Sequence, residues 1–208
     1  MPGTGCTQQA AASVNRMWAS IRAGRPALIV VDAQRGFTHP SWGPRDNPDA
    51  EANIVALLEA WRAAGDPIVL VRHDSDEADS PLRTGSQGNA FLDGVDGPHD
   101  LLVTKTVNSA FLGTPALDDW LRAAGIAAVT LCGITTNHCC ETTARMAGNL
   151  GYTTTFVIDA THTFDRAAAD GTVVPAGELS RITAVNLDGE FARVRTTAEV
   201  LGERVATR

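Results

Sequence analysis

Short apolar runs alternate with amphipathic segments along the chain. Residues 27–31 read ALIVV, a continuous apolar run typical of a strand that is buried on both faces of a sheet. Five further runs of this kind each predict a strand: residues 68–71, 101–103, 127–132, 154–158 and 191–194.

Between these runs, apolar residues recur at the spacing of a helix. Two segments show it at i, i+3, i+4 and i+7: Ile54, Leu57, Leu58 and Trp61, then Leu117, Trp120, Leu121 and Ala124. Gly65 and Gly125 follow them as stop signals. Further helices are predicted at about residues 139–150, near residues 179–187 and after residue 194.

Repeated strand–helix alternation predicts an α/β fold, with a six-stranded parallel sheet between two layers of helices in one domain spanning residues 1–208. Residues 1–24 form an N-terminal extension. Its apolar positions, Val14, Met17, Trp18 and Ile21, predict a helix that packs on the core or on a second subunit.

Two long segments, residues 35–47 and 74–99, are rich in Pro, Gly, Asp and Ser and are predicted to be loops. Ligands bind outside the carboxyl ends of parallel strands. We therefore expect these loops either to shape a substrate site or to be plain surface.

Composition narrows the range of partners. The chain has 208 residues and a net charge of −7, without a cluster of Lys and Arg, so nucleic acid and anionic membranes are poor candidates. No apolar run approaches the roughly 20 residues that a membrane span needs. Residues 1–16 lack the order of a signal peptide, and we expect a cytoplasmic protein.

Cysteine and lysine usage is more informative. The cysteines, Cys6, Cys132, Cys139 and Cys140, show no C-x-x-C spacing, so neither zinc nor a disulfide framework is indicated. Lys105 is the single lysine among 17 basic residues. Its presence is either chance or marks a place where a compact ammonium is required.

Three polar residues fall at the ends of predicted strands. Asp32 follows the first strand, Lys105 follows the third, and Cys139 begins the helix after the fourth, so all three can meet in one cleft. Taken singly, they could be a turn cap, a solvated lysine and a core cysteine. Together they suit acyl transfer: we expect the helix start and the ammonium to lower the pKa of the thiol, and the carboxylate to accept its proton.

Several segments of the sequence resemble those of a known family. Residues 133–139 (GITTNHC) resemble the nucleophile loop of the isochorismatase-like cysteine hydrolases, residues 30–34 (VVDAQ) their Asp-x-Gln, and residues 105–111 (KTVNSAF) their Lys…Ser-Ala-Phe segment. Residues 142–145, 151–152 and 159–160 continue the match, which covers roughly residues 25–202. This superfamily includes nicotinamidases, N-carbamoylsarcosine and ureidoacrylate amidohydrolases, and cyclic-amide hydrolases such as streptothricin hydrolase.

The resemblance implies a strand order of 3-2-1-4-5-6 and a homo-oligomer, a dimer or a tetramer. It implies Cys139 as nucleophile, Asp32 as base and Lys105 as the group that holds the pair. It also implies a cis peptide between Ile134 and Thr135, which turns the amides of Thr135 and Cys139 toward the oxyanion. The expected reaction is hydrolysis of a small amide, a carbamoyl or ureido compound, or a cyclic amide.

Departures from the family pattern matter too. The nicotinamidases carry an Asp-x-His metal cluster after the second strand, which residues 72–76 (RHDSD) do not reproduce, so we expect neither a metal nor another cofactor. His73 could ligate a metal but is expected to be a hydrogen-bonded loop residue. Cys140 is expected to be a packing residue. The candidates for lining the substrate cleft are Phe37, Trp42, Asn108, Phe111 and His138.

Two other functions remain open at this point. One is hydrolysis of a vinyl ether by a true isochorismatase, which usually lacks the nucleophilic cysteine. The other is a binding scaffold without catalysis. The cysteine, the carboxylate and the lysine together favour the amide hydrolase.

Overall fold

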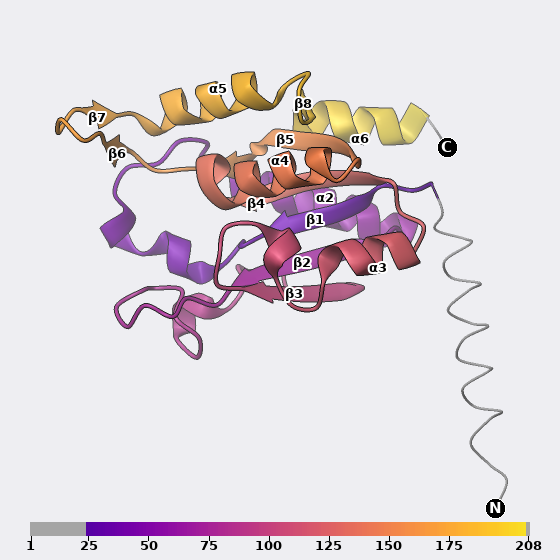
Figure 1. Cartoon of the computed structure of the whole chain (residues 1–208), viewed down its shortest axis with the longest axis horizontal. Helices are drawn as coiled ribbons and strands as arrows, with labels where there is room; N and C mark the ends of the chain where they lie inside the picture. The colour runs from indigo at the N-terminus through magenta and orange to yellow at the C-terminus, as the bar shows by residue number, and fades with distance from the viewer. Residues whose placement is uncertain (1–23, 207–208) are drawn as a thin grey trace, which may run out of the picture.

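The computed structural model describes residues 24–206 (Figure 1). The helix predicted around Val14 and Ile21 lies outside this range. None of the described helices is both long enough and apolar enough to cross a membrane.

The centre of the molecule is a six-stranded parallel sheet with the order β3-β2-β1-β4-β5-β8. Its strands are β1 (Ala27–Val31), β2 (Ile68–His73), β3 (Leu101–Lys105), β4 (Ala128–Ile134), β5 (Thr153–His162) and β8 (Arg193–Arg195). Because β8 is the sixth predicted strand in chain order, the predicted strands and the order 3-2-1-4-5-6 are both confirmed.

Helices cover both faces of the sheet (Figure 1). They are α2 (Ala50–Ala64), α3 (Leu117–Ala123), α4 (Glu141–Asn149), α5 (Ala176–Leu187) and α6 (Thr197–Ala206). α2 and α6 contribute to the core on one face, and α3, α4 and α5 contribute to the core on the other.

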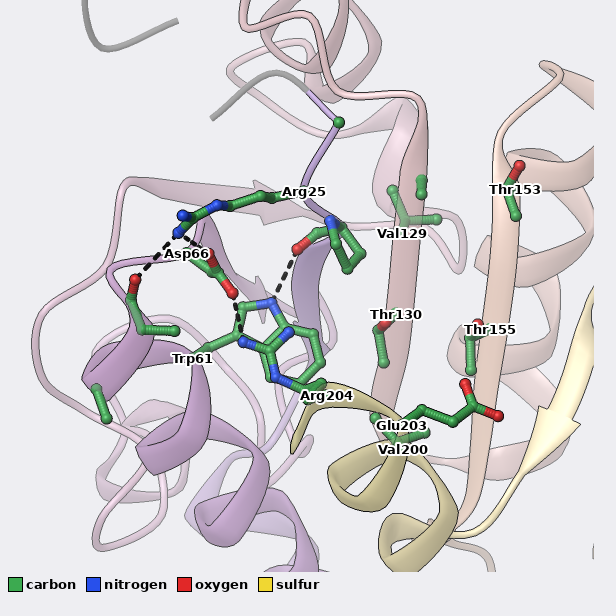
Figure 2. Close-up of a pocket in the computed structure, with 15 residues that line it drawn as sticks. Arg25, Trp61, Asp66, Val129, Thr130, Thr153, Thr155, Val200, Glu203 and Arg204 are labelled. Atoms are coloured by element: carbon green, nitrogen blue, oxygen red, sulfur yellow. Dashed lines mark hydrogen bonds and ion pairs between the residues drawn. The ribbon is translucent and has the colours of Figure 1, made fainter. Parts of the chain in front are cut away.

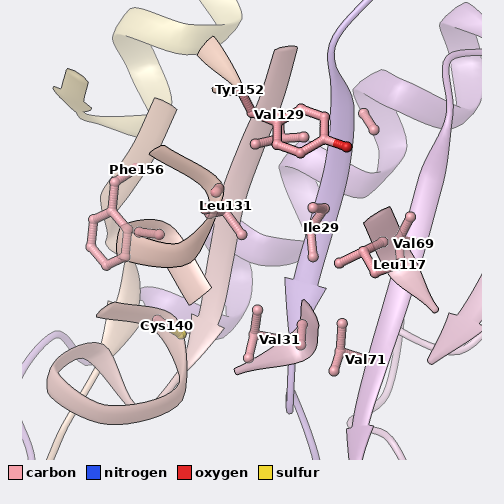
Figure 3. Packing of buried hydrophobic residues seen from close by; sticks show 14 of the residues in the cluster. Ile29, Val31, Val69, Val71, Leu117, Val129, Leu131, Cys140, Tyr152 and Phe156 are labelled. Atoms are coloured by element: carbon pink, nitrogen blue, oxygen red, sulfur yellow. The ribbon is translucent and has the colours of Figure 1, made fainter. Parts of the chain in front are cut away.

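The position of β1 between two layers of helices explains why its sequence is apolar throughout. Leu28 and Val30 point into the core under α2, whereas Ile29 and Val31 belong to the opposite core. Figure 3 shows Ile29 and Val31 between residues of β2 and β4. Side chains alternate across a strand, so a strand with helices on both sides needs apolar residues at every position. Burying each of these side chains contributes about 1.5–3 kcal/mol to stability.

The structure adds elements that the apolar pattern did not predict. β4 and β5 run past their predicted ends, and β5 shifts register against β4 between Leu131 and Gly133. A two-stranded antiparallel hairpin, β6 (Arg166–Ala167) and β7 (Val173–Val174), lies between β5 and α5. Two residues per strand are too few for a periodic signal.

The first long loop is attached to the end of β5. The Asp46 N–H donates to the carbonyl of Thr163 at 3.2 Å, and the Asp165 N–H donates to the carbonyl of Pro44 at 3.0 Å. These backbone hydrogen bonds place the 35–47 loop beside the carboxyl edge of the sheet, where the candidate site lies.

Candidate active site

Asp32 follows directly after β1 and is completely buried. Its φ of 50° is in the left-handed region, which Asp adopts more readily than most residues. Its N–H still donates to the carbonyl of Val71 at 2.9 Å, so the turn starts from a strand that is held in the sheet. Oδ2 accepts a hydrogen bond from Lys105 Nζ at 2.6 Å, and Oδ1 has no hydrogen-bond partner in the described part of the chain.

Lys105 is the last residue of β3, and its side chain is as fully buried as that of Asp32. Burial lowers the pKa of Lys105, but the neighbouring Asp32 and Cys139 raise it more, so the net shift is upward. Burial raises the pKa of the Asp32 carboxyl, and Lys105 offsets only part of that rise. The lysine is therefore an ammonium near neutral pH, and Asp32 is a stronger base than an exposed aspartate.

Cys139 lies in η5 (Thr136–Cys140), a π-helical turn that connects β4 to α4. Its side chain is mostly buried, and Sγ lies 3.8 Å from Asn108 Oδ1. We expected the helix start and the ammonium to lower its pKa. That expectation is wrong here: burial raises the pKa of the thiol, the Asp32 carboxylate raises it further, and Lys105 offsets only part. The resting group is a neutral thiol with a base beside it.

The loop before Cys139 depends on a close approach between β1 and β4. Gly133 has a φ of 131°, and a Cβ there would lie 1.9 Å from the carbonyl oxygen of Val31. Only glycine fits. The next peptide, Ile134–Thr135, is cis, as the resemblance implied. Thr135 and Cys139 line the same pocket.

This pocket has a volume of about 480 Å³ and opens at the carboxyl edge of the sheet. It brings together two of the three predicted catalytic residues and most of the predicted substrate-binding ones: Asp32, Cys139, Thr135, Phe37, Trp42, Asn108 and His138. Lys105 lies beneath it, in contact with Asp32. The roles of these residues remain predictions.

Three aromatic rings form one wall of the pocket. Trp42 stacks on Phe164 with ring centroids 5.3 Å apart, and Phe37 lies 5.1 Å from Trp42. The Trp42 indole N–H donates to the carbonyl of Gly36 at 2.9 Å, which fixes the ring orientation. Such a wall suits a flat, partly apolar substrate.

The structure departs from the sequence prediction at Phe111. Its ring does not line the pocket but packs against Tyr152, with centroids 5.8 Å apart, on the core side of α3 and α4. The segment after β5, which was not among the sequence-based candidates, adds Thr163, Phe164, Asp165 and Arg166 to the lining. The available signal was the position of this segment directly after the fifth predicted strand, since ligands bind outside the carboxyl ends of parallel strands.

His73, which was expected to be a loop residue, is the last residue of a strand. It ends β2 and lines the pocket, and its Nδ1 lies 3.2 Å from Lys105 Nζ. Among the described residues, Asp32, His73 and Cys139 could each present a ligand atom to a metal ion, within 4.8 Å of one another. The Lys105 ammonium already contacts Asp32 and His73, so a metal ion at this cluster would have to displace it.

A larger cavity of about 780 Å³ lies at the opposite edge of the sheet (Figure 2). There Asp66 is paired with Arg25 and Arg204, and the Trp61 indole N–H donates to the carbonyl of Pro26. Its lining contains no cysteine, histidine or lysine. The smaller pocket is therefore the better candidate for chemistry.

The fold and the site define a class: α/β proteins with a carboxylate, an ammonium and a thiol at the carboxyl ends of parallel strands. Comparison with known proteins agrees. Residues 26–177 match the model of the isochorismatase domain. The chain is 37% identical to the isochorismatase family protein YrdC of Bacillus subtilis (strain 168) over 184 residues, which cover 88% of this chain and 98% of YrdC.

Two relatives carry the names of characterised activities. Streptothricin hydrolase of Streptomyces noursei is 34% identical over 181 residues, covering 84% of this chain and 69% of the relative. Nicotinamidase 3 of Arabidopsis thaliana is 33% identical over 181 residues, covering 80% and 82%.

Solved structures show the same fold. A protein of the isochorismatase family from Chromobacterium violaceum ATCC 12472 is 41% identical with a TM-score of 0.81, covering 85% of this chain and 92% of its own. A cysteine hydrolase from Pseudomonas syringae pv. phaseolicola 1448A is 29% identical with a TM-score of 0.76, covering 88% and 94%. The chain belongs to the isochorismatase family and is a hydrolase.

Proposed function

We propose that this hydrolase opens the C–N bond of a small amide, a carbamoyl or ureido compound, or a cyclic amide, through a thioester on Cys139. The observation that carries the proposal is the arrangement of the buried Asp32–Lys105 pair beside the Cys139 thiol. The names streptothricin hydrolase, nicotinamidase and cysteine hydrolase among the similar proteins support the same reaction class.

In the first half of the reaction, Cys139 attacks the substrate carbonyl and its proton passes to Asp32. Oδ1 suits this role because its partner oxygen already accepts from Lys105. The raised pKa values of the thiol and of the carboxyl fit a proton that is transferred during attack and not before it. The amides of Thr135 and Cys139 are the proposed donors to the oxyanion.

In the second half, Asp32 returns the proton to the leaving nitrogen, and the C–N bond breaks to leave an acyl-thioester. Asp32 then takes a proton from a water molecule that attacks the thioester. The C–S bond breaks and Asp32 passes this proton to the Cys139 sulfur, so the acid product leaves and both the thiol and the carboxylate are restored. The Lys105 ammonium remains charged throughout and offsets the negative charge that moves between sulfur and carboxylate.

A screen of small amides for release of ammonia or amine tests the reaction class. Each active compound is then mixed with the protein, quenched with acid, and the mass of the Cys139 peptide is measured. An acyl adduct on Cys139, absent in Cys139→Ala, supports the proposal. Turnover of an amide without any adduct under trapping conditions contradicts the thioester on Cys139.

A further inference from the structure

His73 and Lys105 are register partners at the ends of the neighbouring parallel strands β2 and β3. Partners in adjacent strands point to the same face, and here His73 Nδ1 lies 3.2 Å from Lys105 Nζ. An ammonium has donors and no lone pair, so Nδ1 accepts this hydrogen bond. The ring is therefore neutral and carries its proton on Nε2.

The environment of His73 keeps the ring neutral. Burial lowers its pKa, and the Lys105 ammonium lowers it further. The carboxylates of Asp32, Asp74 and Glu77 raise the pKa of His73, but the net shift remains downward. The charged and titratable groups around the ring are Lys105 from β3, Asp32 from the end of β1, Asp74 and Glu77 from the loop after β2, and the Cys139 thiol, whose sulfur lies within 4.8 Å of a ring nitrogen.

The backbone of His73 is held from β1. Gln34, which is fully buried, accepts from the His73 N–H at 2.8 Å and donates to the His73 carbonyl at 3.0 Å. Asn89 donates to the same carbonyl at 3.1 Å. His73 thus has a fixed position, although a polar loop follows it.

The ammonium of Lys105 contacts Asp32 Oδ2 and His73 Nδ1, and the Cys139 sulfur lies within 4.8 Å of ligand atoms of both these residues. A hydrogen bond to one acceptor sets the rotation of a –NH₃⁺ group about its Cε–Nζ bond but leaves Nζ free to shift around that acceptor. Two acceptors in fixed directions hold Nζ as well, so the direction of the third N–H is fixed.

Building on the proposed function, we propose that His73 is a positioning residue that orients the Lys105 ammonium so that its third N–H faces the Cys139 sulfur. Gln34 contributes by holding the His73 backbone. The neutral imidazole acts as an acceptor for Lys105 and takes no part in bond making. This gives the Gln of the Asp-x-Gln segment a physical reason, since its side chain connects the end of β1 to the end of β2.

Three substitutions separate positioning from simple packing. His73→Asn keeps an acceptor, because an amide Oδ1 and the imidazole Nδ1 are both bonded to Cγ. His73→Gln moves the amide one methylene further out, and His73→Leu keeps bulk but removes the acceptor. The matched control is His99→Asn, the same substitution at an exposed residue of the loop before β3.

The test measures how fast iodoacetamide alkylates Cys139 between pH 6 and 10, read by mass spectrometry of the Cys139 peptide, with kcat and KM on any amide found active. The thiolate is the reactive form, so its rate reports the field of the ammonium without requiring the natural substrate. At pH 7.5 we expect His73→Leu and His73→Gln to react about tenfold more slowly, and His73→Asn and the control within about twofold of the parent. kcat should fall in the same order, with KM little changed.

An unchanged rate in His73→Leu overturns the inference, as does an Asn variant that is as slow as Gln. If His73→Leu does not fold, the comparison of Asn with Gln decides. A different result, the absence of an acyl-enzyme in the parent protein, would contradict the proposed function. The alkylation rates of the His73 variants can still be compared in that case.

Discussion

The Asp32 carboxylate and the Lys105 ammonium form an ion pair of 2.6 Å in which neither side chain is exposed to solvent. A pair this deeply buried adds little net stability, because removing both charges from water costs about as much as their attraction returns. Removing one partner is different, since it leaves an uncompensated buried charge. The pair is thus better explained by chemistry at Cys139 than by stability.

Lys105 should not tolerate arginine. Lys105→Arg keeps the charge, but a planar guanidinium does not fit a closed site built around a compact ammonium. We expect kcat to fall on the order of 100-fold or more in both Lys105→Arg and Lys105→Met, with little change in KM. Steady-state kinetics on an active amide measure this. Full activity in Lys105→Arg would place the lysine outside the reaction.

Substitution of the two adjacent cysteines, Cys139 and Cys140, should have different effects on turnover and on stability. Cys139 lines the pocket, whereas Cys140 is completely buried in the core with Ala144 and Phe156. Cys139→Ala should abolish turnover and leave the thermal unfolding midpoint nearly unchanged. Cys140→Ala should keep kcat and lower the free energy of unfolding by about 1 kcal/mol. An inactive Cys140→Ala beside an active Cys139→Ala would reverse the assignment.

Gly133 should be irreplaceable. A Cβ at this position would lie 1.9 Å from the Val31 carbonyl oxygen, and the backbone has a φ of 131°. We expect Gly133→Ala to destabilise the protein by about 3 kcal/mol or more, since neither the β1 backbone nor the sheet register can move freely. Gly177→Ala in α5 is the control, because a Cβ there meets nothing within 4 Å. Urea unfolding of both variants measures the difference.

His162 should make stability depend on pH. It is fully buried, neither ring nitrogen has a hydrogen-bond partner in the described part of the chain, and Glu51 lies 3.6 Å away. Burial, with a smaller effect of Arg45, lowers the pKa of His162 to about 4. Between the unfolded pKa of about 6.5 and this value, the unfolded chain binds a proton that the folded chain does not, so stability falls as pH falls.

Because of this histidine, the free energy of unfolding should fall by about 2 kcal/mol when the pH is lowered from 7.5 to 5. His162→Gln removes the titration, so its urea unfolding curves should shift less between these pH values. The exposed His99→Gln serves as the control and should keep the parent's pH dependence. Equal pH dependence in parent and His162→Gln would show that the ring is accessible to protons in the folded state.

Activity should not require a metal ion. Lys105 Nζ already contacts two of the three side chains that could form a ligand set, so a cation there would have to displace it. We expect dialysis against a chelator to leave kcat unchanged within about twofold, since no step of the proposed acyl transfer uses a Lewis acid. Complete loss of activity that zinc or iron restores would contradict this. Measuring metal content before and after dialysis completes the experiment.

Much of the fold was encoded locally. The apolar run of β1 requires cover on both faces, and the spacing of Ile54, Leu57, Leu58 and Trp61 produces the helix that supplies one cover. Strand ends then placed Asp32, Lys105 and Cys139 at one edge of the sheet. These features depend on periodicity and on chain order, which a sequence contains.

The tertiary structure decided what depends on distance and burial. Phe111 turned toward Tyr152, while Phe164 entered the aromatic wall, because loop paths and the register shift in β5 carry no periodic signal. The pKa of Cys139 rises where the helix start and the ammonium suggested a fall, since desolvation depends on the surrounding side chains. His73 reaches Lys105 only because β2 and β3 are neighbours in register, a contact between residues 32 positions apart that no local pattern specifies.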